Sequence, residues 1–426
     1  MPDKQPGTTR RLPLSPRPLA AVVFLAITGA AAALLSATGE QLSVGILLGA
    51  WLGAFAVYVL YRFGFFAERV TLRLPGSAAA QVEKMRRTTG KARLRPSAEA
   101  AYLTAAEADE TEGEVQPEDR VIGIEVDGHA IAYPLAALAV REVAHEVFNG
   151  RHVFVTWWPV TYAARAFVLD APPGGGEPTL TPLRKTVLNS SVLLGPGAEQ
   201  VVQFIGQAAG RKEPGETLRQ IPVVSTNWRA WSAAFPHTEV MSLEGTPRED
   251  MFERYYITNR AGLHQQSAKN RRWHDKDTVL GVEVNGEAKA YPYPALIERP
   301  LIQEELGGEP VLIAHERISA TAVAFSRRVD GQVLTFKGDS RNPRRPSAEP
   351  GEADTRRRIH YEPWFLVDEQ TGSRWRAVSG VCVSGKLKGS CLPLLPAQTG
   401  FWFAWSRFYP NAQAVEPRAP AGGKGG

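Results

Sequence analysis

One stretch of the chain combines residue types that are unusual for a plain buried strand. The segment "FVTWWPVTYAARAF", Phe154–Phe167, runs from strand-forming residues through a Trp-Trp-Pro step to small residues and one Arg. Aromatic residues and Pro stand where a buried strand would carry Val and Ile. The stretch is therefore either specialised packing or the shell of a chemical site whose reactive atom is missing.

A second segment carries side chains that could ligate a metal or relay a proton. "REVAHEV", Arg141–Val147, places Glu142, His145 and Glu146 at positions i, i+3 and i+4. In a helix these three side chains share one face. Two carboxylates and an imidazole in that arrangement suit proton transfer or metal ligation. A solvated helix face beside a hairpin is the simpler interpretation, and we predict no metal site and no cofactor.

The charge distribution argues against nucleic-acid binding. The formal net charge is +5 over 426 residues, but nine Lys and Arg with only two acids fall between Arg62 and Arg95. Eight acids and no base follow between Glu99 and Asp119. Two opposed charge blocks differ from the basic folded face of a nucleic-acid binder. The sequence also contains no P-loop, no Rossmann glycine fingerprint and no Cys-x-x-Cys zinc spacing.

The Trp-Trp-Pro stretch belongs to an internal repeat. "VIGIEVDGHAIAYP", Val121–Pro134, returns as "VLGVEVNGEAKAYP", Val279–Pro292, at an offset of 279 − 121 = 158. The same offset aligns "VFVTWWPVTYAARAF" with "VLIAHERISATAVAF". Further on, "NWRAWSAAFPHTEV" matches "FWFAWSRFYPNAQA" at an offset of 401 − 227 = 174, and we expect its tryptophans to be core. The chain therefore contains two related halves.

Each half opens with a predicted β-hairpin. The dipeptides Asp127-Gly128 and Asn285-Gly286 supply the two positive-φ positions of a type I′ turn. A short helical pattern follows the first hairpin: Leu135, Leu138, Val143 and Val147. We therefore predict an α+β fold, rich in antiparallel β-hairpins, with two tandem related halves.

With these motifs in this order, the sequence resembles the bacterial family called domain of unknown function 3179. The resemblance runs from about Arg120 to Val415 and also rests on "VDEQTGSRWRAVSG", Val367–Gly380, and "FWFAWSRFYP", Phe401–Pro410. The biochemical activity of that family is not established. The resemblance therefore implies a fold and the position of a site, and it implies no particular reaction.

The position implied by the resemblance is the Trp-Trp-Pro step. Relatives usually place a Cys, and some a selenocysteine, before the Pro and a second Cys three residues later, where this chain has Trp158 and Thr161. A hydroxyl or thiol three residues on can assist a reactive thiol. An indole cannot act as a nucleophile or cycle between thiol and disulfide. "LNSS", Leu188–Ser191, similarly resembles the family's "RNSD" without its acid.

Two functions remain open after these observations. The first is a non-catalytic binding or scaffold protein with a degenerate site in the first half, whose small ligand or protein partner the sequence does not identify. The second is a thiol- or selenol-dependent redox enzyme whose reactive residue lies at position 158. Selenocysteine is encoded by UGA, and a gene translation that reads UGA as Trp would show a Trp at this position. The predicted binding residues are Trp157, Trp158, Thr161, Glu142, His145 and Glu146.

Two N-terminal segments predict a membrane element. Leu19–Thr38 and Leu42–Tyr61 are each 20 residues without a charge, which suffices to cross a hydrocarbon core of roughly 30 Å. We expect a transmembrane helical hairpin in a multi-pass protein whose soluble part is cytoplasmic, since bases flank both ends. If the first span is a cleaved signal peptide, the soluble part lies outside. Gly45, Gly49 and Gly53 share a face that allows helix–helix association.

The predicted organisation follows from these segments. It comprises a basic cytoplasmic tail (1–18), two transmembrane helices (19–61), a charged linker (62–119), the first half (120–245), a connector (246–278), the second half (279–416) and a disordered tail (417–426). The two cysteines, Cys382 and Cys391, could pair across an eight-residue loop, but at two in 426 residues we expect them to be free and packed.

Overall fold

The computed structural model describes the folded part of the chain. The described residues are 100–171, 176–195, 199–208, 217–247, 250, 252–263, 267–268, 271–340 and 363–416. The predicted basic tail, both predicted spans with Gly45, Gly49 and Gly53, the linker up to residue 99 and the tail 417–426 lie outside them. No helix in the described part is long and apolar enough to cross a membrane. This finding contradicts the prediction of a multi-pass membrane protein with a cytoplasmic soluble part.

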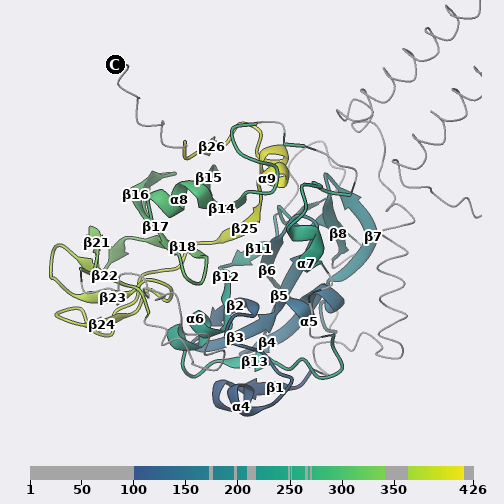
Figure 1. Ribbon diagram of the computed structural model, residues 1–426, viewed down its shortest axis with the longest axis horizontal. Helices are drawn as coiled ribbons and strands as arrows, with labels where there is room; N and C mark the ends of the chain where they lie inside the picture. Colours follow the sequence, from purple (N-terminus) through teal and green to yellow (C-terminus); the bar gives the residue numbers. More distant parts are fainter. Residues whose placement is uncertain are drawn as a thin grey trace, which may run out of the picture.

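The elements of the first half occupy the blue to teal part of the chain in Figure 1. They are β1 (Tyr102–Thr104), α4 (Ala105–Glu110), β2 (Arg120–Val126), β3 (His129–Pro134), α5 (Leu135–Arg141), β4 (Val143–Phe148), β5 (Arg151–Trp158), β6 (Ala163–Leu169), β7 (Thr181–Val187), β8 (Ser190–Leu194), β9 (Gln200–Val202), β10 (Gln207–Ala208), β11 (Arg219–Ile221), β12 (Val224–Asn227), α6 (Trp228–Ala234) and β13 (Glu239–Met241).

The connector and the second half follow in green to yellow (Figure 1). They comprise α7 (Glu253–Tyr256), β14 (Thr278–Val284), β15 (Glu287–Pro292), α8 (Tyr293–Glu298), β16 (Leu301–Leu306), β17 (Glu309–Glu316), β18 (Thr321–Ser326), β19 (Arg328–Val329), β20 (Gln332–Val333), β21 (Phe336–Gly338), β22 (Phe365–Asp368), β23 (Arg374–Arg376), β24 (Cys382–Ser384), β25 (Ala397–Phe401), α9 (Trp402–Phe408) and β26 (Gln413–Ala414).

The predicted α+β class is wrong, because the described chain is β-rich with several antiparallel sheets. Its helices α4 to α9 have only four to seven residues. The helical pattern after the first hairpin continues only to Arg141, where α5 ends, and Glu142 then adopts a left-handed conformation with φ 62°. Val143 and Val147 lie in β4 instead, since β-branched side chains fit a strand paired with β5.

The order of elements repeats at the offsets found in the sequence. The run β2, β3, α5, β4, β5, β6 corresponds to β14, β15, α8, β16, β17, β18, 158 residues later. β12 pairs antiparallel with β2 as β25 does with β14, and β13 pairs parallel with β3 as β26 does with β15. The first half has one additional strand in this sheet, because β1 pairs with the outer side of β13.

In each half, a tryptophan of a helix packs directly against a glycine of the sheet. A Cβ at Gly123 would lie 2.2 Å from the Trp231 ring, and one at Gly281 would lie 1.9 Å from the Trp405 ring. Only glycine allows the indole to rest directly on the strand backbone. Trp231 is 0% and Trp405 1% exposed, which confirms that these tryptophans are core. The predicted type I′ turns are also confirmed, with φ 53° at Asp127.

The two halves meet through equivalent turns. The turn between β5 and β6 contacts the second half, where the Phe401 amide donates to the carbonyl of Thr161 over 2.8 Å. The turn between β17 and β18 contacts the first half, where the Arg120 guanidinium donates to the carbonyl of Ser319, the counterpart of Thr161. The Trp-Trp-Pro step therefore lies at the junction of the halves.

Candidate functional site

The Trp-Trp-Pro step is the end of β5 and the tight turn that follows it. The Tyr162 amide donates to the Pro159 carbonyl over 3.2 Å, and Tyr162 has φ 55°. Its counterpart Ala320 has φ 49°, so both halves build the same turn. Successive strand residues face opposite sides. Trp157 accordingly packs in the first-half core, with its ring 5.0 Å from that of Tyr162, and Trp158 faces the other way.

Trp158 is enclosed by a second segment that the family resemblance singled out. The indole is 6% exposed, and its Nε1–H donates to the backbone carbonyl of Asn189 over 2.6 Å. Asn189 is fully buried with φ 70°, and its side-chain oxygen accepts from the Leu263 amide over 2.9 Å. The fold thus brings "LNSS" onto the step. Sequence reasoning left Asn189 out of the site, although the likeness of "LNSS" to the family motif was the signal for it.

The connector between the halves also closes over the step. The Tyr255 hydroxyl donates to the Val160 carbonyl over 2.8 Å and accepts from the Gly262 amide over 3.0 Å. The Lys276 ammonium lies 3.3 Å from the centre of the Tyr255 ring and donates to the Tyr255 carbonyl. Desolvation, together with the nearby charge of Arg260, lowers the pKa of Lys276 to about 8. These contacts fix the outer side of the turn.

The Thr161 hydroxyl does not reach solvent. Thr161 is 0% exposed, and its Oγ1 makes no hydrogen bond within the described part of the chain. Nearby, the Gln203 amide donates to Thr156 Oγ1 and to the Ala163 carbonyl, each over 3.1 Å. Arg165, also buried, donates through Nε and Nη2 to the Phe204 carbonyl. Gln203 and Arg165 therefore hold backbone carbonyls beside the step, while the Thr161 hydroxyl is buried without a hydrogen bond among the described residues.

The segment "REVAHEV" is not the helical face that its spacing predicted. Glu142 ends α5, and its carbonyl accepts from the Trp157 amide over 2.9 Å. His145 and Glu146 are neighbours in β4 and so face opposite sides of the sheet. Their environments consequently differ, and the three side chains do not share the one face that a helix would give them.

The histidine of this segment lies in an aromatic stack. His145 lies parallel to the Phe154 ring at 4.2 Å between centroids, and its Nε2 is 3.0 Å from Nδ1 of His152. Burial, with a smaller contribution from His152, lowers the pKa of His145. The stacked rings of His145, His152 and Phe154 lie on β4 and β5, and β4 is the edge strand of this sheet.

The glutamate of this segment lies on the other face, beside two tyrosines. Glu146 accepts a hydrogen bond from the Tyr102 hydroxyl of β1, and desolvation raises its pKa to about 7. The structure therefore places Trp157, Trp158 and Thr161 together at the step, and the backbone carbonyl of Glu142 accepts from the Trp157 amide there. Glu146 belongs to a separate polar site.

The comparisons with known proteins agree with this architecture. A family model described as "Protein of unknown function (DUF3179)" matches residues 96–412. No curated protein and no solved structure matches the chain. The matched range includes the first half with the Trp158 step and the Asn189 segment, the connector, and the second half up to residue 412, so the chain belongs to this DUF3179 family of unknown function.

Proposed function

We propose that this chain is a non-catalytic binding or scaffold protein in which the first-half step has lost its chemistry. The observation that carries the proposal is the closure of position 158: the indole is 6% exposed and its N–H is used by the Asn189 carbonyl. A side chain that presents a reactive atom needs at least one open side. Here Asn189 and Tyr255 of the connector make hydrogen bonds to the turn and pack around it.

The thiols that the chain does possess also favour this proposal. The sequence has two cysteines, and both are free, with Cys382 buried and Cys391 exposed. They lie in or beside the small β21–β24 sheet of the second half. Burial raises the pKa of the Cys382 thiol, which disfavours the reactive thiolate. Burial raises the pKa of the Cys391 thiol as well, and both thiols lie in the second half, so neither takes the place of a reactive residue at the first-half step.

A Trp158→Cys variant tests the proposal. Replacing a large buried side chain costs roughly 3–5 kcal/mol of stability, so folding is first checked by circular dichroism. Thiols are then counted with a colorimetric disulfide reagent in native and denatured protein. We expect the denatured variant to gain one thiol over the parent, and the native variant to gain no rapidly reacting thiol and no peroxide consumption.

The matched background is a Cys391→Ser protein, which removes the exposed thiol that would otherwise dominate the native signal. In this background, a rapidly reacting thiol that appears only with Trp158→Cys would overturn the proposal. That result would mean that the ancestral site remains accessible beneath the indole.

The alternative function is a selenol-dependent redox enzyme with its reactive residue at position 158. The feature that favours it is the retained turn geometry, with Tyr162 and Ala320 both left-handed, on which a reactive residue before Pro159 would be presented. The mass of the peptide that contains residue 158, purified from the native source, separates the two functions. A tryptophan mass supports the binding protein, and a selenocysteine mass, with its selenium isotope pattern, supports the enzyme.

A further inference from the structure

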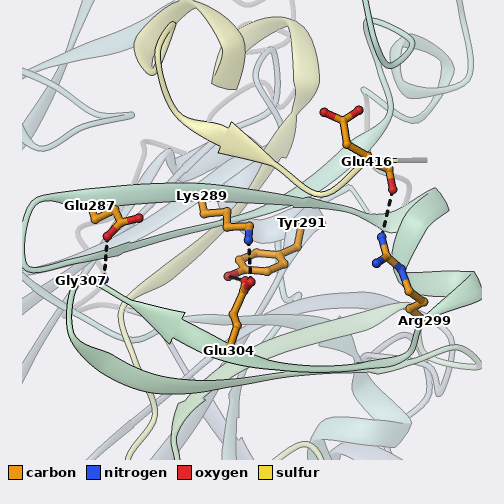
Figure 2. Close-up of polar contacts among 7 residues, drawn as sticks. All are labelled: Glu287, Lys289, Tyr291, Arg299, Glu304, Gly307 and Glu416. Atoms are coloured by element: carbon orange, nitrogen blue, oxygen red, sulfur yellow. Dashed lines mark hydrogen bonds and ion pairs between the residues drawn. The ribbon is translucent and has the colours of Figure 1, made fainter. Parts of the chain in front are cut away.

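One face of β16 is fixed to the neighbouring hairpin of the second half by polar contacts. Figure 2 shows the Lys289 ammonium 2.6 Å from Glu304 Oε2, in the middle of β16, while the Tyr291 hydroxyl donates to Glu304 Oε1 over 2.5 Å. Just after the strand, the Gly307 amide donates to Glu287 Oε2 over 2.9 Å. A strand held in this way is already ordered, so pairing with another strand costs little further ordering.

The outer side of β16 is an unpaired edge, because the strand stands last in the order β16-β17-β18. The His315 amide donates to the Pro300 carbonyl over 2.8 Å, and bonded pairs alternate along an antiparallel ladder. The backbone N–H and C=O groups of Leu301, Gln303 and Glu305 therefore point away from β17. These groups have no hydrogen-bond partner in the described part of the chain. Glu305 is exposed, and the other two residues are partly exposed.

Both faces of β16 are already covered by the protein itself. Ile302 and Leu306 pack in the core beneath the β14–β15 hairpin. On the opposite face, Leu301 packs against the core that includes Phe336, and the Gln303 amide group exchanges hydrogen bonds of 2.8 and 2.7 Å with the Phe336 backbone. The surface left for a partner is therefore a row of backbone groups, which a β-strand can pair with and an amphipathic helix cannot.

We propose that β16 pairs antiparallel with β16 of a second copy of this chain, across a twofold axis at Gln303, so that the two three-stranded sheets form one continuous sheet. In this register Gln303 faces Gln303 of the second copy, and Leu301 faces Glu305. All outward backbone groups of both strands are then paired. A register centred on Glu305 would oppose two carboxylates, and one centred on Leu301 would leave Glu305 beyond the end of the second strand.

The charges at the two ends of the edge favour a second copy as the occupant. Arg299 lies just before β16 and Glu305 near its end, and both are exposed. The twofold register makes each Arg299 a diagonal neighbour of Glu305 in the other copy. One guanidinium nitrogen, Nη2, donates to the Glu416 carbonyl over 3.0 Å (Figure 2), which leaves further donors for a carboxylate. The interface uses no residue of the Trp158 step, so the inference goes beyond the proposed function and does not depend on it.

The test measures the association of the full chain and the place where it occurs. Sedimentation velocity over about 1 to 100 μM should show a reversible monomer–dimer equilibrium of micromolar affinity, since one pair of short strands buries little area. Amide hydrogen exchange, read by mass spectrometry at the same concentrations, should show protection of peptides from residues 299–307 that increases with concentration. Peptides from β4, the edge strand of the corresponding first-half sheet, should show no such dependence.

Substitutions of Glu305 separate backbone pairing from charge. Glu305→Pro removes an N–H that faces away from β17 and should lower the association constant by about tenfold or more. Glu305→Gln, the matched control, keeps this N–H and the side-chain size, and it should lower association by no more than about threefold. Glu305→Arg opposes Arg299 of the second copy and should weaken association by about tenfold. Adding Arg299→Glu to Glu305→Arg restores opposite charges and should recover most of the parent's association.

Several results would overturn the proposal. They are a folded parent that stays monomeric over the whole concentration range, association that is unchanged by Glu305→Pro, and concentration-dependent protection that appears in other peptides but not in 299–307. Circular dichroism first checks that each variant folds. If Glu305→Pro does not fold, the charge reversals decide, because association of Glu305→Arg equal to that of the parent would exclude the twofold register.

Discussion

Glu146 makes stability depend on pH with a sign opposite to that of most carboxylates. Its folded pKa is about 7 against an ordinary value of 4.5, a difference of 7 − 4.5 = 2.5. Because the folded state holds the proton more tightly, the contribution is fully present below pH 4.5 and is lost as pH rises through 7. At 1.36 kcal/mol for each unit, the full effect is about 3 kcal/mol, and partial exposure of Glu146 makes about 2 kcal/mol the better expectation.

Urea denaturation at intervals between pH 4.5 and 8 measures this contribution. The free energy of unfolding of Glu146→Gln, minus that of the parent, should change by about 2 kcal/mol across this window, with the variant relatively more stable at high pH. Glu304→Gln should not reproduce that profile, because Glu304 is paired with Lys289. Parallel curves for Glu146→Gln and the parent would show that the carboxyl ionises as easily in the fold as in water, which would refute the reasoning.

Two further predictions concern packing. Gly123→Ala and Gly281→Ala should each lower the free energy of unfolding in urea by about 1–3 kcal/mol, because the added methyl meets a buried indole ring. Gly338→Ala is the control, since the space around Gly338 is open. An equal loss of stability in Gly338→Ala would contradict the packing argument. Trp158→Phe should cost about 1 to 2 kcal/mol more than Trp157→Phe, since the Trp158 indole donates to the Asn189 carbonyl over 2.6 Å, whereas Trp157 Nε1 makes no hydrogen bond of comparable geometry within the described residues. Equal urea midpoints would contradict this.

The features that the sequence predicts well are those set by backbone requirements. Asp127 and Asn285 take φ values of 53° and 50°, as the type I′ turns require. The equal spacing of the repeat reappears as an equal order of strands, because a duplicated alternating pattern has the same strand register in both copies. Local signals of this kind do not depend on what lies across the fold.

The features that the sequence missed depend on distant contacts. The spacing of Glu142, His145 and Glu146 has the period of a helix, but the β-branched Val143 and Val147 beside them also fit a strand, and the pairing of β4 with β5 decides between the two. The approach of Asn189 to Trp158 spans 31 residues and arises from the β7–β8 turn. The residues next to Trp158 and Asn189 in the sequence do not predict that these two residues come into contact.

The second half supplies an independent argument for the proposal that position 158 has a structural role. Its counterpart, Glu316, is 6% exposed, as Trp158 is, and it faces its own turn. The Glu316 carboxylate accepts from the Ile318 amide over 3.0 Å and from the Ser319 amide over 2.8 Å, which satisfies two backbone donors of the turn. Trp158 instead satisfies an acceptor, the Asn189 carbonyl. Two unrelated side chains thus use the same position to satisfy buried backbone groups, and neither leaves a reactive atom exposed.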